Sequence, residues 1–147
     1  MKPFEILLVE DNPGDIHLTM EAFKEGRVLN HLNVVKDGQE AINYLQRKDE
    51  YAQSKRPDII LLDLNLPKKD GREVLEEIKA DPQFKRIPVV VLTTSIADQD
   101  VEGAYGHFAN CYIRKPVDLN NFLEVAKRIE DFWLSTVTLP RSDLAYE

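Results

Sequence analysis

The chain has 147 residues, of which 43% are hydrophobic and 31% charged, a composition typical of one globular domain with a sizeable core. The net charge of −7 argues against a nucleic-acid surface, and no apolar run approaches the ~20 residues of a membrane span. A single cysteine, Cys111, excludes an internal disulfide, and the first residues lack a signal-peptide pattern, so we expect a cytoplasmic protein.

Strand-like and helix-like segments alternate along the first part of the chain. An apolar run at residues 5–10 ends in acids and is followed by a helical stripe over residues 16–23. A more polar strand at 31–36 precedes a helical pattern at 41–45. The third strand, residues 58–63, is almost entirely apolar until its final aspartate.

The same alternation continues to residue 134. A helix with apolar residues over 74–78 leads to a fourth strand at 87–94. A weak, glycine-interrupted helix near 98–108 leads to a fifth strand at 111–115. A long helix over about 118–134 completes five β–α units.

This alternation predicts an α/β fold with a parallel sheet covered by helices on both faces. The polar strand at 31–36 suits an edge position, whereas the apolar strands suit the centre. A doubly wound, flavodoxin-like (βα)5 sheet of order 2-1-3-4-5 satisfies both conditions with right-handed crossovers.

Three acids follow the first and third strands. Glu10 and Asp11 come at the end of the first, and Asp63 at the end of the third. In a sheet of this order, sites form at the carboxyl ends of the strands, where the winding reverses between strands 1 and 3. The three carboxylates are therefore expected to converge.

Crowded carboxylates repel one another, and a hard divalent cation relieves that repulsion. Thr93, Thr94 and Lys115 end the fourth and fifth strands at the same edge, and their hydroxyls and ammonium suit phosphate oxygens. Alone, each residue has an ordinary interpretation, such as a strand end, a helix cap or a surface lysine. Together they predict a Mg²⁺ and phosphoryl site in which Asp63 is the nucleophile.

At these residues the sequence resembles the receiver domain of two-component response regulators. The motifs are "LLVEDN", "LLDLNLPKKDG", "PVVVLTTS" and "YIRKP", within a receiver domain over residues 1–134. The resemblance implies that Asp63 accepts phosphate from a phosphohistidine of a sensor histidine kinase. It also implies Mg²⁺, or Mn²⁺, bound by Asp11, Asp63 and the carbonyl of Asn65, with Glu10 acting through water.

The resemblance further assigns parts of a switch. Thr93 matches the hydroxyl that moves onto the phosphate, and Lys115 matches the lysine that pairs with it. Tyr112 takes the position of the rotating aromatic residue. The family's cis peptide bond would lie between Lys115 and Pro116.

More narrowly, "LLDLNLPKKDGREVL", "RIPVVVLTTS" and "IEDFWLSTVTLP" resemble small regulators that partner bacterial phytochromes. This resemblance implies a phytochrome as the sensor. Residues 135–147 read as a tail without an output domain. Signalling would then pass through contacts with an unknown downstream protein, without direct nucleic-acid or membrane binding.

Other functions remain open on the sequence alone. A haloacid-dehalogenase-type, Mg²⁺-dependent phosphatase also uses a strand-end aspartate, but it has an acid where this chain has Asn65. A flavodoxin-like electron carrier would need a phosphate loop where "EDNPGD" stands, and a docking module would not need the full acid, Thr and Lys set. We expect no separate enzyme activity, only assistance to the protein's own phosphorylation and dephosphorylation.

The last helix carries more apolar residues than one buried face needs. A stripe of five is expected to face the sheet: Leu119, Phe122, Ala126, Ile129 and Trp133. Further apolar residues lie off that stripe, including Leu123, Val125, Phe132 and Leu134. We expect a two-fold homodimer whose interface includes Val125, Ile129 and Phe132; the alternative is that the tail covers this surface.

Overall fold

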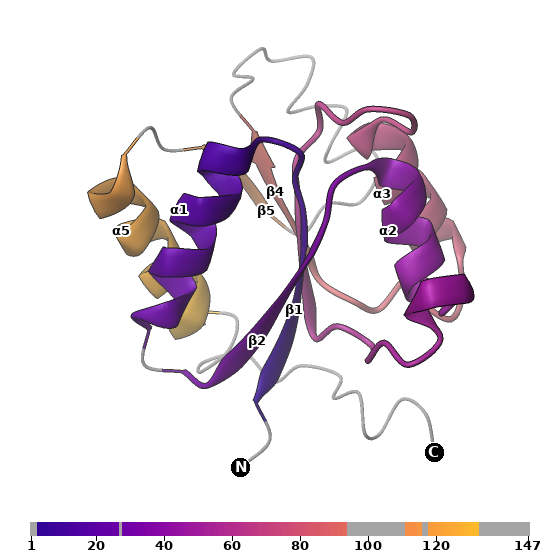
Figure 1. The fold of residues 1–147 in the computed structure, drawn as a ribbon, viewed down its shortest axis with the longest axis horizontal. Coiled ribbons are helices and arrows are strands. Elements are labelled where there is room, and N and C mark those ends of the chain that lie inside the picture. Colours follow the sequence, from indigo (N-terminus) through magenta and orange to yellow (C-terminus); the bar gives the residue numbers. More distant parts are fainter. Residues whose placement is uncertain (1–2, 27, 94–110, 116–117, 133–147) are drawn as a thin grey trace.

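Five parallel strands form the centre of the molecule in the order β2-β1-β3-β4-β5 (Figure 1). The computed structural model describes residues 3–26, 28–93, 111–115 and 118–132. The strands are β1 (Phe4–Val9), β2 (Asn30–Val35), β3 (Ile59–Leu62), β4 (Val89–Thr93) and β5 (Cys111–Arg114). The predicted fold class and strand order are therefore confirmed, including the edge position of the polar strand β2.

The burial of each strand follows its composition. β3, with the sequence IILL, is fully buried between β1 and β4, as a central parallel strand requires. β2 is mostly partly buried, with His31 exposed and Val35 buried, and it pairs only with β1 among the described strands. The chain thus winds outward in one direction from β1 to β2 and in the other from β3 to β5.

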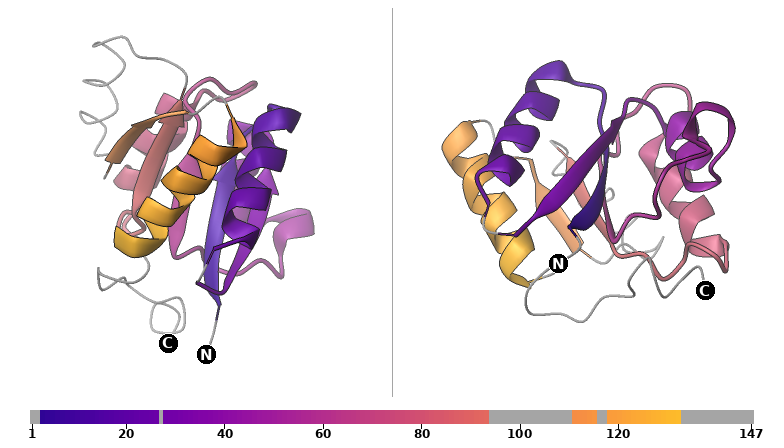
Figure 2. Two further views of the ribbon diagram at one scale, coloured as in Figure 1. Left: turned by 90° about the vertical axis from the view of Figure 1, so that its left-hand side faces the viewer. Right: turned by 60° about the horizontal axis from the view of Figure 1, so that its bottom comes forward.

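Helices pack on both faces of the sheet. They are α1 (Pro13–Lys24), α2 (Gly38–Leu45), α3 (Gly71–Ala80) and α5 (Leu119–Ile129), with a short 3-10 helix, η1 (Asp49–Tyr51). Figures 1 and 2 show α1 and α5 side by side on one face and α2 and α3 on the other. Each of the four α-helices begins with an Asn or Asp whose side chain accepts a backbone N–H of the first turn.

Two separate cores lie on the two faces of the sheet. One joins Leu7, Leu62 and the buried faces of α2 and α3, and the other joins Leu8, Leu61 and the faces of α1 and α5. This division follows from the alternation of side chains along a strand, since neighbouring residues point to opposite faces. No helix among the described residues has the length and apolarity needed to cross a membrane.

The dimer residues expected on α5 require a correction. Ile129 is only 2% exposed and belongs to the core, so it is not available to a partner. Val125 also packs partly against that core, because the shared surface of α1 and α5 is wider than one stripe. Leu119 is 38% exposed instead of facing the sheet, and Phe132 is 55% exposed. The predicted helix at 98–108, Trp133, Leu134 and the tail lie outside the described residues.

Candidate functional site

The carboxyl ends of β1 and β3 bring two acids together. Val9 and Leu62 are paired in the sheet, so the residues that follow them, Glu10 and Asp63, leave neighbouring strands at the same level. The Asp63 backbone N–H donates to the Val9 carbonyl (3.1 Å) and fixes this alignment. Glu10 is 3% exposed and Asp63 6% exposed. The acids at the ends of these apolar strands therefore lie in a buried site and not on the surface.

Asp11 completes a cluster able to hold a metal ion. One carboxylate oxygen from each of Glu10, Asp11 and Asp63 lies within 4.8 Å of the others. Glu10 and Asp63 are buried, whereas Asp11 is exposed. An all-oxygen set that is open on one side suits Mg²⁺ or Mn²⁺, which keep several waters when bound by proteins. The expected divalent-cation cofactor therefore fits the residues present.

Short local hydrogen bonds hold the acids in place. Glu10 Oε2 accepts the backbone N–H groups of Asp11 (3.1 Å) and Asn12 (3.2 Å). Asp63 Oδ1 accepts the N–H of Asn65 (3.2 Å). One oxygen of each buried acid is thus oriented by the backbone, which leaves the other directed into the site.

Lys115 lies at the centre of the site, with a side chain that is only 5% exposed. Its Nζ donates to Glu10 Oε1, to Asp15 Oδ2 (3.0 Å) and to Asp63 Oδ2 (3.3 Å). The sequence pattern predicted Lys115 and the two strand-end acids but missed Asp15. An acid in the first turn of a helix is common because it suits the helix dipole, so its position gave no sign of this contact.

The buried charges change the pKa values of their neighbours. Burial raises the pKa of Glu10 to about 7, and the charge of Asp63 adds to the rise, while Lys115 opposes it. Burial alone would lower the pKa of Lys115, but the hydrogen bonds to Glu10 and Asp15 and the charge of Asp63 outweigh it. The pKa of Lys115 therefore lies above its ordinary value, so the site keeps one fixed cation.

The loop after β3 turns back tightly on the end of that strand. The N–H of Gly71 donates to the Leu64 carbonyl (2.9 Å), which brings the start of α3 back against the end of β3. A Cβ at Gly71 would overlap the Asp63 carbonyl oxygen. Only glycine fits this approach, so "LNLPKKDG" closes with glycine for a steric reason.

The remaining predicted residues are placed only in part. Thr93 ends β4 opposite Arg114, and Tyr112 lies in β5 opposite Val91, so the two expected switch residues do belong to adjacent strands. For Thr93 and Tyr112 the structure describes the backbone alone. Thr94 and Pro116, with the expected cis bond, lie outside the described residues.

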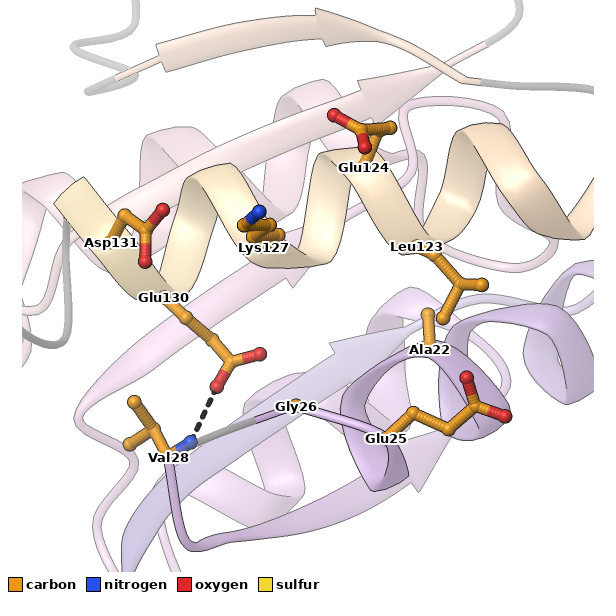
Figure 3. A pocket seen from close by; sticks show the side chains of 9 residues that line it. All are labelled: Ala22, Glu25, Gly26, Val28, Leu123, Glu124, Lys127, Glu130 and Asp131. Atoms are coloured by element: carbon orange, nitrogen blue, oxygen red, sulfur yellow. Dashed lines mark hydrogen bonds between the residues drawn. The ribbon is translucent and has the colours of Figure 1, made fainter.

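A pocket lies between α1 and α5, toward the other end of the strands (Figure 3). There the carboxylate of Glu130 reaches across from α5 and accepts the N–H of Val28 (2.7 Å). A Cβ at Gly26 would overlap Glu130 Oε1. This buried acid therefore joins α5 to the segment between α1 and β2 and is explained by packing.

Comparisons with known proteins agree with this geometry. Residues 6–127 match the response regulator receiver domain family. The response regulator Rcp1 of Synechocystis is 51% identical over 138 residues, which cover 94% of this chain and 94% of Rcp1.

Two solved structures are similar over nearly the whole chain. The phosphorylated cyanobacterial phytochrome response regulator RcpA has a TM-score of 0.91 at 54% identity, covering 95% of this chain and 100% of that one. The Mn²⁺-bound form of Rcp1 has a TM-score of 0.88 at 51% identity, with the same coverage. None of these relatives favours the phosphatase alternative.

Proposed function

The chain belongs to the response regulator receiver domain family, and we propose that its phosphoacceptor is Asp63. The observation that carries this proposal is the position of Asp63, which is buried at the switch point of the sheet beside Glu10, Asp11 and Lys115. A carboxylate in this position can attack a phosphohistidine phosphorus, so that an O–P bond forms at Asp63 and the P–N bond to the histidine breaks.

In this proposal Glu10, Asp11 and Asp63 hold Mg²⁺ or Mn²⁺, and the similarity to the Mn²⁺-bound form of Rcp1 supports that assignment. The bound cation supplies positive charge to the phosphoryl oxygens. The backbone N–H groups that hold Glu10 and Asp63 keep their carboxylates oriented, and Lys115 brings a second positive charge to the same oxygens. The carbonyl of Asn65 and the hydroxyls of Thr93 and Thr94 complete the proposed site.

The proposed phosphodonor is a sensor histidine kinase. RcpA is a phytochrome response regulator, and its similarity to this chain supports a phytochrome as the sensor. The protein then acts on its own phosphorylation and dephosphorylation rather than on a separate substrate, and signals to a downstream protein by contact. A cytoplasmic location is part of this proposal, since one cysteine in 147 residues leaves no internal disulfide.

Phosphorylation by a small phosphodonor tests the site. With Mg²⁺ and acetyl phosphate, the wild-type protein should gain one base-labile phosphate by intact mass, and Asp63→Asn should gain none, because the nucleophile is lost while its shape is kept. Asp58→Asn is the matched control, since Asp58 is also buried (1% exposed) but lies at the other end of β3. Equal labelling of the wild type and Asp63→Asn would refute the assignment.

We propose that the switch joins Thr93 to Tyr112 through the paired strands β4 and β5. Phosphate contacts would bias a two-state element, with Tyr112 rotating as Thr93 moves toward the phosphate. Thr93→Ala should keep phosphorylation by acetyl phosphate but lose the change in Tyr112 ¹³C-methine NMR signals that beryllofluoride produces in the wild type. An unchanged Tyr112 spectrum in the wild type would exclude this switch.

We also propose a homodimer whose interface includes Phe132 but not the buried Ile129. Phe132 is exposed three residues beyond the end of α5, and large exposed apolar side chains often mark interfaces. Sedimentation should give about twice the 16.9 kDa chain mass, and Phe132→Glu should give the monomer. Met20→Glu is the control, because Met20 is 46% exposed but lies on α1. A wild-type monomer, with and without beryllofluoride, would contradict the dimer.

A further inference from the structure

Lys115 has three acidic partners, and they do not all belong to the metal cluster. Glu10 and Asp63 are in the cluster, whereas Asp15 is not. Asp15 comes from the first turn of α1, 100 residues away in sequence from Lys115. An ammonium group has three N–H donors, so the three carboxylates use all of them.

Asp15 is held in place from its own side. Its backbone N–H donates to the side chain of Asn12, the N-cap of α1 (3.0 Å), and its carbonyl accepts the hydroxyl of Thr19 (2.7 Å). The Asp15 side chain is 23% exposed, so it borders the site without being sealed inside it. The backbone of Asp15 is therefore fixed at the start of α1, and its carboxylate lies on the rim of the site, 3.0 Å from Lys115 Nζ.

A bound cation changes the balance among the three partners. Glu10 Oε2 and Asp63 Oδ1 already accept backbone N–H groups, and Lys115 contacts the other oxygen of each acid. A divalent cation in the cluster must use these same carboxylates, and its charge repels the ammonium. Among the carboxylates that Lys115 contacts in the described residues, Asp15 is the one that lies outside the cluster and does not bind the cation.

We propose that Asp15 is a positioning residue that keeps the Lys115 ammonium beside Asp63 when a divalent cation occupies the acidic cluster. This inference rests on the proposed function and deepens it, because Lys115 must stay near Asp63 to meet the incoming phosphoryl oxygens. All three acids hold Lys115 before the cation binds, and Asp15 keeps its contact with Lys115 afterwards. The role belongs to α1 and adds a residue to those that end the strands.

Amine labelling followed by peptide mass spectrometry measures how accessible Lys115 is, and it requires no phosphorylation. In the wild type, Lys115 should stay protected from an amine-reactive acylating reagent with and without Mg²⁺. In Asp15→Asn, Lys115 should stay protected without Mg²⁺, and its labelling rate should rise at least about tenfold when Mg²⁺ is added, the loss expected for one hydrogen bond between charged groups. The exposed Lys24 and Lys36 serve as internal references.

Two variants separate positioning from a general loss of charge. Glu21→Gln removes one carboxylate from the same helix, near its other end and apart from the three acids that Lys115 contacts, and it should behave as the wild type. Asp15→Glu keeps the carboxylate and should restore most of the protection.

Three results would overturn the proposal: Lys115 protected in Mg²⁺-loaded Asp15→Asn, Lys115 labelled in metal-free Asp15→Asn, or Lys115 labelled in the Mg²⁺-loaded wild type. A wild type that takes no phosphate from acetyl phosphate would instead refute the proposed function. Because protection is measured without phosphate, the two failures are distinguishable.

Discussion

Buried acids lie near both ends of the parallel strands, but their surroundings differ. Near the amino ends of the strands, called here the amino edge, each acid has donors of its own: Asp58 Oδ2 accepts the N–H of Glu5 (2.9 Å), and Glu130 Oε2 accepts that of Val28 (2.7 Å). The carboxylate of Glu5 contacts His31 Nδ1 (3.0 Å), along with neighbouring polar side chains. These acids are neutralised or hydrogen-bonded one at a time.

At the carboxyl ends of β1 and β3, the acids instead share their partners. Glu10, Asp11 and Asp63 gather within 4.8 Å, and one cation, Lys115, serves two of them together with Asp15. Such an arrangement leaves like charges close together and favours a second cation. Burial of an acid therefore does not mark a functional site in this molecule; the convergence of several acids on one cation does.

The largest expected effect comes from removing the shared cation. Lys115→Met should lower the free energy of unfolding by ~3 kcal/mol without divalent ions, because removing one partner leaves buried carboxylates uncompensated. Lys55→Met makes the same exchange at the amino edge, where the side chain is 69% exposed and Nζ lies 3.8 Å from Glu5 Oε1. It should cost less than ~0.5 kcal/mol, as exposed pairs usually do. Urea unfolding at pH 8 measures both, and equal losses would remove the distinction between the edges.

An effect of at most the same size should follow from the pKa of Glu10. Its folded-state pKa of about 7 exceeds the ordinary 4.5, so the folded protein binds the proton more tightly. The resulting stabilisation is fully present below pH 4.5 and is lost as the pH rises to about 7, a change of roughly 3 kcal/mol at most.

Mg²⁺ should counteract that loss, because a cation favours ionised Glu10. The increase in Tm on adding saturating Mg²⁺ should therefore be larger at pH 8 than at pH 6, where the cation must displace a proton. Thermal unfolding measures this, and Glu10→Gln should remove most of the pH dependence. A Mg²⁺ effect that is equal at both pH values in the wild type would show that Glu10 is already ionised at pH 6.

The sequence predicted the fold because each level of pattern pointed to the same answer. The apolar runs of β1 and β3 matched buried strands, and the more polar β2 matched an edge. Parallel order then determines which strand ends meet, so Glu10 and Asp63 were brought together by topology alone.

Two features could not be predicted because they depend on side-chain geometry. The contact between Asp15 and Lys115 joins residues 100 positions apart, and neither residue type specifies the other. The apolar spacing is compatible with Ile129 in the buried stripe and with Ile129 in a dimer interface, and only the packing of α5 against α1 decides that it is core. The spacing of apolar residues gives a direction around the helix, whereas the width of the covered face depends on the neighbouring helix.

The smallest expected effect tests the packing at the amino edge. Gly26→Ala places a Cβ where Glu130 Oε1 lies, so the carboxylate must move from its hydrogen bond with Val28. Overpacking of this kind costs ~1–3 kcal/mol. In a Glu130→Ala background the obstacle is absent, and Gly26→Ala should cost ~1 kcal/mol less than in the wild type.

Urea unfolding of the four proteins measures this coupling, while Mn²⁺ affinity should change by less than about twofold, since the acidic cluster lies at the opposite edge. An equal cost in both backgrounds would assign the effect of Gly26 to its backbone, and a large change in Mn²⁺ affinity would show that the two edges are coupled.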